Sequence, residues 1–282
     1  MPHKNNASVL LRGGGDLATG VALRLHRAGI KLVIAELPQP LAVRRTVSFS
    51  EAVYEGRQTV EGVTACLVEP DQTRPEFGRR VSSVMDAGEI PVLIDPDADI
   101  LSHLNFLVVV DARLIKSPPA PLPIDVPLHI GLGPGFHAGK DCHAVVETRR
   151  SHTLGRVYWT GTTQPDSGKP EGDSRRVLRA PDDGILMAHA KIGDHVEEGQ
   201  VVAVVSDQHQ VISPFKGVLR GLIHPGLRVT KGLKIGDVDP RDDPGSCYLV
   251  SDKALAIGGG VLEAILSKAE IRSKLWPLSV TS

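Results

Sequence analysis

An internal repeat constrains the fold of this chain more than any other feature of its sequence. The segment Ala180-Pro-Asp-Asp-Gly184-Ile-Leu returns as Ser213-Pro-Phe-Lys-Gly217-Val-Leu, at an offset of about 33 residues. At the same offset, and without a gap, Val196 matches Val229 and Gly199 matches Gly232. A fixed period indicates a duplicated supersecondary unit, because one repeat cannot bury its apolar face alone. We therefore expect residues 178–245 to fold as one compact β domain.

The pattern of this repeat resembles the paired half-motifs of biotinyl and lipoyl domains. The resemblance implies a barrel-sandwich hybrid, in which two half-barrels of short strands interlock. In carrier members the modified lysine lies in the hairpin between the halves, whereas the corresponding hairpin Ser206–Val211 contains no lysine. The tripeptide Asp252-Lys253-Ala254 matches the lipoyl sequence but lies outside the repeat. We therefore expect no covalent biotin or lipoate.

A glycine loop near the N-terminus has the pattern of a phosphate-binding turn. Arg12-Gly-Gly-Gly-Asp-Leu-Ala18 follows the apolar strand Val9–Leu11 and opens a helical segment that ends at Ala28. A second strand, Lys31–Ala35, leads to Glu36, which completes a dinucleotide-binding fingerprint. The glycines allow a phosphate to approach the backbone, the helix N-terminus supplies free N–H groups, and Glu36 would accept hydrogen bonds from a ribose. The predicted ligand contacts are Gly13, Gly14, Gly15, Asp16 and Glu36.

Two alternatives to this interpretation stay open. Asp16 places a carboxylate inside the loop, where it would repel a phosphate, and it is also suited to capping the helix that follows. The loop as a whole could belong to a scaffold that binds no ligand.

The alternation of apolar runs and helical segments predicts the fold class. Apolar strands separated by helices imply a parallel sheet covered on both faces. We expect an α/β protein in which a Rossmann-like parallel sheet domain carries an inserted all-β barrel-sandwich hybrid. The expected division is a Rossmann-like domain over 1–160, a linker over 161–177, the duplicated domain over 178–245, and a C-terminal segment over 246–282 that docks back on the first domain. In that segment, residues 255–266 have a helical pattern despite Gly258-Gly-Gly260, which marks either the start of a helix or very close packing.

Further candidate residues follow other predicted strands. Arg44 and Arg45 stand beside hydroxyl side chains, and guanidinium groups bind phosphate or carboxylate bidentately. A glycine-rich stretch, residues 131–139, would bring backbone amides close to a ligand. These motifs add Arg44, Arg45, Asp111, Lys116, Gly133 and Gly135 to the predicted ligand contacts. Solvated arginines and surface salt bridges are the alternatives.

Cys142 and His143 are the candidates for a chemical step, because a neighbouring imidazole favours the thiolate. With His137 and His152 they could also ligate a metal, but their spacing fits no standard site, so we expect no metal. A buried structural cysteine beside a surface histidine is the simpler interpretation.

The composition excludes several classes of function. Lys and Arg number 32 against 33 Asp and Glu, so the footprint of a nucleic-acid or membrane-surface protein is missing. Three scattered cysteines do not make a disulfide framework and favour a reduced compartment. The start of the chain has no signal-peptide pattern, and no apolar run approaches the roughly 20 residues that span a bilayer. We expect a cytoplasmic protein.

Several long motifs together resemble the YqeB-type proteins, which are accessory proteins of selenium-dependent molybdenum hydroxylase systems. The motifs include Arg12-Gly-Gly-Gly-Asp-Leu-Ala-Thr-Gly20, Arg44-Arg-Thr-Val-Ser-Phe-Ser-Glu-Ala52, Asp141-Cys-His-Ala-Val-Val-Glu-Thr148 and Lys234-Ile-Gly-Asp-Val-Asp-Pro-Arg241. The glycine-loop region is also similar to the Rossmann-like part of xanthine dehydrogenase accessory proteins. The resemblance implies a protein that matures or inserts the molybdenum cofactor, with a hydroxylase or other maturation proteins as partners.

The ligand implied in this way is a nucleotide such as NAD(P), or the molybdenum cofactor itself. Whether the protein is an enzyme stays open, since the resemblance assigns no catalytic residue. An NAD(P)-dependent oxidoreductase is one alternative, although no Tyr-x-x-x-Lys motif is present. A ligand-free interaction scaffold is another, and a homo-oligomer is compatible with each interpretation.

Overall fold

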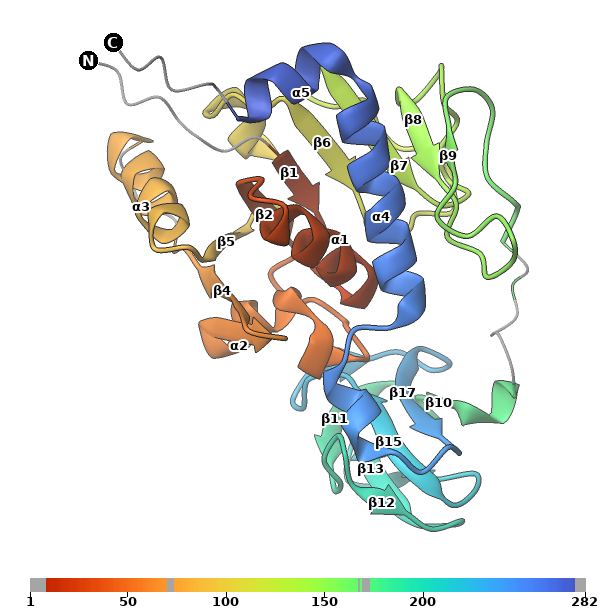
Figure 1. Ribbon diagram of the computed structural model, residues 1–282. Helices are drawn as coiled ribbons and strands as arrows, with labels where there is room; N and C mark the ends of the chain where they lie inside the picture. Colours follow the sequence, from red (N-terminus) through yellow and green to blue (C-terminus); the bar gives the residue numbers. More distant parts are fainter. Residues whose placement is uncertain (1–8, 70–73, 167, 169–172, 277–282) are drawn as a thin grey trace.

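The chain forms a larger α/β unit and a smaller all-β unit (Figure 1). The computed structural model describes residues 9–69, 74–166, 168 and 173–276. Part of the linker expected over 161–177, and the ends of the two outer segments expected at 1–160 and 246–282, lie outside these residues. The chain enters the smaller unit through the 3-10 helix η4 (Ser174–Arg176) and leaves it through η5 (Pro244–Tyr248).

The larger unit is built on a nine-stranded sheet in the order β3-β4-β5-β2-β1-β6-β7-β8-β9. Its strands are β1 (Val9–Arg12), β2 (Leu32–Glu36), β3 (Arg57–Val60), β4 (Val63–Leu67), β5 (Ile90–Ile94), β6 (Val108–Asp111), β7 (Leu128–Leu132), β8 (Ala144–Val146) and β9 (Val157–Tyr158). The strands from β4 to β8 run parallel, whereas β3 and β9 pair antiparallel at the two edges. The sheet is therefore mixed.

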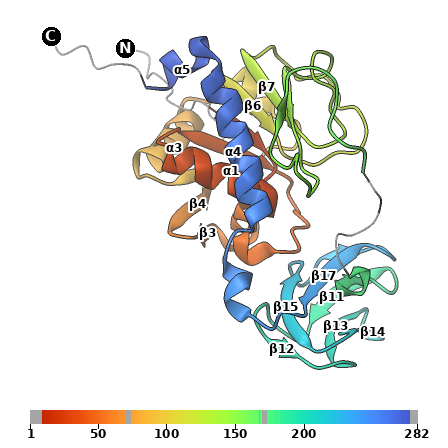
Figure 2. The same cartoon turned by 45° about the vertical axis from the view of Figure 1, so that its right-hand side comes forward.

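The helices cover the two faces of this sheet unequally. They are α1 (Asp16–Arg27), α2 (Ala52–Glu55), α3 (Arg74–Asp86), α4 (Asp252–Ser267) and α5 (Ala269–Leu275), with 3-10 turns η1 (Arg45–Val47), η2 (Phe49–Glu51) and η3 (Asp99–Ser102). Apolar side chains of α1 and α4 share one core with the sheet, and those of α3 share a second core on the opposite face. Figure 2 shows α4 lying along α1. Within the described residues no helix combines the length and apolar character needed to cross a membrane.

The predicted fold class is wrong. In a Rossmann sheet the third parallel strand would lie beside the second, but here β5 separates β2 from β4. Both edges are antiparallel, and the described connections from β6 to β7 and from β7 to β8 contain no helix. The apolar runs indicated burial on both faces, but burial does not specify the direction or the neighbour of a strand. The Glu61-Gly62 turn, with positive φ at both residues, makes β3 and β4 a hairpin.

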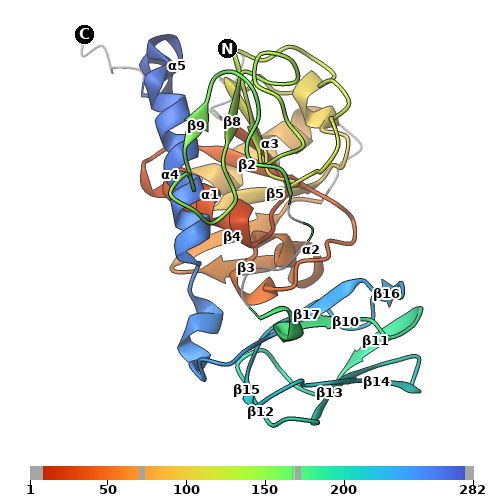
Figure 3. The same cartoon turned by 90° about the vertical axis from the view of Figure 1, so that its right-hand side faces the viewer.

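The second part of the predicted fold class, the inserted barrel-sandwich hybrid, is also wrong. The smaller unit consists of two antiparallel four-stranded sheets, β10-β17-β15-β12 and β14-β13-β11-β16, rather than an inserted barrel-sandwich hybrid. The strands are β10 (Val177–Arg179), β11 (Gly184–Ala188), β12 (His195–Val196), β13 (Val201–Val205), β14 (His209–Ile212), β15 (Gly217–Leu222), β16 (Arg228–Val229) and β17 (Lys234–Asp239). Figure 3 shows these strands on one side of the larger unit, with α4 rising from them.

The sequence repeat nevertheless has a structural counterpart. Gly184 opens β11 and Gly217 opens β15, at equivalent positions of the two halves. A Cβ at Gly217 would lie 2.4 Å from the carbonyl oxygen of Asp239, so close backbone packing explains the glycine there. The apolar side chains of both halves form a core of their own.

Candidate functional site

A cleft of about 920 Å³ lies where the larger unit, the smaller unit and the start of α4 meet. The larger unit contributes the end of the glycine loop, the first residues of α1 and the segment 41–44, whereas the smaller unit contributes β15 and β17. Charged side chains dominate the walls. The cationic ones are Arg44, Arg150, Arg176, Arg220, Lys234, Arg241 and Lys253, and the acidic ones are Asp16, Asp237, Asp239 and Asp252.

Two buried carboxylates on β17 hold three of the guanidinium groups in place. Arg220 donates from Nε to Asp237 (2.7 Å) and from Nη1 to Asp239 (3.0 Å). Arg176 also pairs with Asp237, and Arg241 donates to Asp239 from Nε (2.9 Å). Hydrogen bonds from Arg241 lower the pKa of Asp239 to about 2, so this carboxylate is ionised at neutral pH. The network fixes a set of positive charges along one wall of the cleft.

Arg44, which the sequence predicted as an anion contact, is part of the cleft and joins it to η5. Its Nη2 donates to the carbonyl oxygens of Ser246 (3.1 Å) and Leu249 (2.9 Å), and its Nη1 lies 3.9 Å from the carboxylate of Asp16. Burial lowers the pKa of Arg44, although a guanidinium stays charged at physiological pH. Its buried Nε has no hydrogen-bond partner within the described structure. Arg44 therefore has an unused donor.

Arg45 has a different place. It donates from Nε to the carbonyl oxygen of Leu222 (3.2 Å) and from Nη1 to Glu51 (3.1 Å), and it does not line the cleft. Arg44 and Arg45 therefore both tie the larger unit to the smaller one, but only Arg44 lines the cleft.

The carboxylate of Glu36, at the end of β2, holds the glycine loop in place. Gly14 donates its N–H to Oε2 of Glu36 (2.6 Å), and Leu37 donates to Oε1 (2.7 Å). Burial raises the pKa of Glu36, and these two hydrogen bonds oppose the shift. Gly13 adopts a positive φ of 96° at the turn out of β1. The carboxylate predicted to accept from a ribose thus accepts from the protein's own backbone and does not line the cleft.

Gly15 and Asp16 do line the cleft. Gly15 is the N-cap of α1, and a Cβ built on it would meet no atom within 4 Å. Asp16 is the first residue of the helix, not its cap, and its Oδ1 accepts from the N–H of Leu17 at 2.9 Å. The loop therefore presents open backbone and one partly exposed carboxylate to the cleft.

The remaining predicted ligand contacts lie elsewhere. Asp111 is fully buried and accepts two short hydrogen bonds from Arg113, with Arg12 at 3.6 Å. Lys116 is exposed and pairs with Asp166 at 2.6 Å. Gly133 and Gly135 belong to a loop that packs closely against other segments of the same chain. A Cβ at Gly135, for example, would lie 2.3 Å from the carbonyl oxygen of Ile115. None of the four lines the cleft.

Cys142 and His143 are not arranged as a nucleophile and its base. The Cys142 thiol is buried and donates to the carbonyl oxygen of Ala144 at 3.2 Å. Burial raises its pKa to about 11, so the thiol is protonated at neutral pH. Nδ1 of His143 instead accepts the backbone N–H of His129 at 2.9 Å.

The sequence reasoning missed most of the cationic wall. Arg176, Arg220 and Lys234 come from separate elements, and only folding brings them together. One signal was present: Asp237 and Asp239 alternate along β17 and so share one face of the strand. Buried carboxylates in a strand require cationic partners, which would have pointed to nearby arginines.

One cluster offers metal-ligating atoms. Donor atoms of Glu51, Glu55 and His224 lie within 4.8 Å of one another. However, Oε1 of Glu51 already accepts from Arg45 (3.1 Å) and lies 2.9 Å from Nδ1 of His224, whose ring stacks on Tyr54. A guanidinium beside the carboxylate opposes cation binding, so we interpret the cluster as a contact between the two units.

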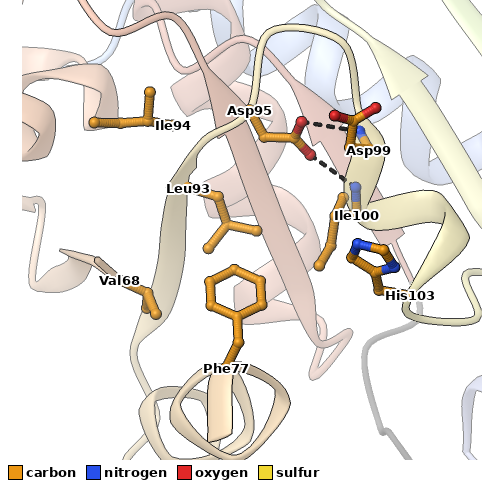
Figure 4. A pocket seen from close by; sticks show the side chains of 8 residues that line it. All are labelled: Val68, Phe77, Leu93, Ile94, Asp95, Asp99, Ile100 and His103. Carbon is orange, nitrogen blue, oxygen red and sulfur yellow. Dashed lines mark hydrogen bonds between the residues drawn. The ribbon is translucent and has the colours of Figure 1, made fainter. Parts of the chain in front are cut away.

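A second hollow, of about 190 Å³, lies at the end of β5 (Figure 4). Phe77 and Leu93 line it with apolar surface. The carboxylate of Asp95 accepts from the N–H groups of Asp99 (2.8 Å) and Ile100 (3.0 Å), as Figure 4 shows. The Asp95 carboxylate thus shapes η3, and the hollow is much smaller than the charged cleft, which is the stronger candidate.

Comparison with known proteins supports the resemblance to YqeB. No family model matches the chain. It is 46% identical over 262 residues to "Uncharacterized protein YqeB" of Escherichia coli (strain K12), a match that covers 92% of this chain and 47% of that protein. The chain therefore spans about half the length of this curated relative.

Solved structures give a weaker likeness. An aspartoacylase family protein from Mesorhizobium loti matches at 16% identity and a TM-score of 0.25, covering 82% of this chain and 85% of that one. A succinylglutamate desuccinylase/aspartoacylase from Rhodobacter sphaeroides matches at 15% and 0.28, covering 83% and 85%. At such TM-scores the likeness carries no argument about activity.

Proposed function

We propose that the cleft binds a phosphate-bearing anion, and that the protein handles such a cofactor during maturation of a molybdenum hydroxylase. The observation that carries the proposal is the charge of the cleft. Seven cationic side chains face four acidic ones, although the chain as a whole is almost neutral. An excess of three positive charges in one concave site favours a ligand with several negative charges.

The backbone around the cleft supports the same chemistry. Gly15 and Asp16 at the start of α1, and Ser251 and Asp252 at the start of α4, all line it. Helix N-termini carry free N–H groups and a partial positive charge, which favour an anion.

The role in maturation rests on the resemblance to YqeB-type proteins. In that role the cargo is the molybdenum cofactor, whose phosphate would face the cationic wall. Glu36, the ribose acceptor of the nucleotide alternative, is buried, accepts from Gly14 and Leu37, and does not line the cleft. The geometry therefore favours recognition of the phosphate over recognition of a ribose.

Gly15→Val should weaken binding of a phosphate-bearing ligand about tenfold or more while the fold survives. Gly15 lines the cleft, and a Cβ built on it would meet no atom within 4 Å. A valine there should therefore fit the fold and obstruct the approach of a phosphate to the backbone; about 1.4 kcal/mol corresponds to tenfold. Calorimetric titration with pyrophosphate, NAD(H), NADP(H), other nucleotides and molybdenum cofactor measures the effect.

The matched control is Gly259→Ala, because Gly259 is also open to solvent but lies outside the cleft. It should bind as the wild type does. In cells, Gly15→Val should lower the molybdenum content and activity of the partner hydroxylase while the amount of folded protein stays the same. A wild-type protein that binds none of the ligands would rule the proposal out.

A further inference from the structure

Among the described residues, one cation of the cleft, Lys234, differs from the others in having no hydrogen-bond or ion-pair partner. Arg44 donates to backbone carbonyls, Arg220 and Arg241 donate to β17 carboxylates, and Arg150 forms a bidentate pair with Asp252. The remaining two, Arg176 and Lys253, also have contacts within the protein. The ammonium group of Lys234 has no hydrogen bond or ion pair within the part of the chain that the structure describes.

The surroundings of Lys234 leave its charge uncompensated. It begins β17, and the charged groups facing it are Asp237 on the same strand, Arg176 on η4, Asp16 on α1 and Arg220 on β15. Asp237 is the strongest attraction among them, but it already pairs with both arginines. Lys234 is exposed as a residue, and partial desolvation of its amine lowers its pKa. The two arginines lower the pKa further, and Asp237 and Asp16 oppose the shift.

We propose that Lys234 is the residue that contacts the phosphate group of the ligand, and that this ion pair forms only when the ligand is bound. The partnered arginines would provide a fixed positive field around it. The ligand class is an oxyanion with at least two negative charges, such as a phosphate monoester or a pyrophosphate, because the excess in the cleft is three positive charges. This inference rests on the proposed function and names the residue that carries out recognition.

Binding of an anion at Lys234 should be linked to the uptake of protons. A bound anion favours the charged ammonium, so binding raises the pKa of Lys234 from its lowered value in the free protein. Where the free amine is partly deprotonated, binding must take up protons. Affinity should therefore fall as the pH rises through the free-state pKa, and it should be fully present below that pKa.

Calorimetric titration of the full chain with pyrophosphate tests this, in buffers of different ionisation enthalpy and over a series of alkaline pH values. The wild type should take up protons on binding. Lys234→Met should bind about tenfold more weakly or worse and show no uptake of its own. Lys234→Arg should recover part of the affinity without the uptake, because a guanidinium stays charged. Lys231→Met removes an exposed lysine outside the cleft and should behave as the wild type does.

The outcomes separate this inference from the proposed function. If Lys234→Met binds pyrophosphate as tightly as the wild type, or shows the same proton uptake, the assignment of Lys234 is wrong and the anion-binding cleft stands. If the wild type binds neither pyrophosphate nor any other phosphate-bearing ligand of the panel, both proposals fail. A thermal melt of each variant confirms that the comparison is made between folded proteins.

Discussion

Gly258→Ala should lower the free energy of unfolding by about 2–3 kcal/mol, whereas Gly259→Ala, one residue further on, should raise it by up to about 1 kcal/mol. A Cβ at Gly258 would lie 2.6 Å from the carbonyl oxygen of Gly20 in α1, closer than real Cβ contacts allow. The same atom at Gly259 would meet nothing within 4 Å. The two substitutions should change the stability in opposite directions. The methyl group at position 258 must push α1 and α4 apart, whereas the one at position 259 only adds the higher helix propensity of alanine.

Urea unfolding of the two variants measures both effects. Gly260→Ala is a second variant of the close-packed kind, since its Cβ would lie 2.1 Å from the carbonyl oxygen of Gly155. If all three substitutions stabilise the protein, Gly258 and Gly260 are not needed for the close contacts with Gly20 and Gly155. In that case α4 does not pack on α1 at the observed distance.

The glycine run shows what the sequence could predict locally. Residues 255–266 were expected to be helical, and they belong to α4, where Gly258 and Gly260 mark close packing. The strand Val9–Leu11, the glycine loop and the helix after it were predicted in the same way, and they correspond to β1 and α1. Apolar periodicity and glycine positions depend on contacts close in the chain, and the sequence displays those directly.

The order of the strands could not be predicted, because it depends on contacts between distant segments. Nothing in the apolar run of β5 shows that it lies between β2 and β4. Glu36 illustrates the same limit at the site. Its position after β2 fitted a ribose acceptor, yet the backbone N–H groups of Gly14 and Leu37 reach it first. The fold class was wrong because the order and direction of the strands depend on such distant contacts and not on the local apolar pattern.

The candidate site was predicted only where the glycine loop and Arg44 contribute to it. Its other wall is formed by β15 and β17, more than 150 residues away from these motifs in the chain. No motif joins such segments. The pattern Asp237-Val-Asp239 indicates two carboxylates on one face of a strand, but their burial and their arginine partners become visible only in three dimensions.

The folded protein should lose about 3 kcal/mol of stability between pH 6.5 and pH 4 through His129 alone. The imidazole is only 6% exposed, and its Nε2 has no hydrogen-bond partner within the described residues. Burial lowers its pKa from 6.5 to about 4; the charges of His143 and Arg12 act in the same direction, and Asp111 opposes them. The unfolded chain therefore binds a proton in this range that the folded protein does not, so stability is fully present above the unfolded pKa and falls as the pH is lowered.

Other groups also titrate in acid, so the test is the difference between wild type and His129→Gln. The glutamine is polar and neutral at every pH, so it removes the titration of the buried imidazole. The variant should lose stability at neutral pH through imperfect packing, yet its unfolding free energy should fall less steeply from pH 6.5 to pH 4. His189→Gln replaces an exposed histidine and should follow the wild-type curve. Parallel curves for wild type and His129→Gln would mean that the buried imidazole accepts its proton in the folded state as readily as in the unfolded chain. The loops that cover β7 would then admit water to a site that the structure shows closed.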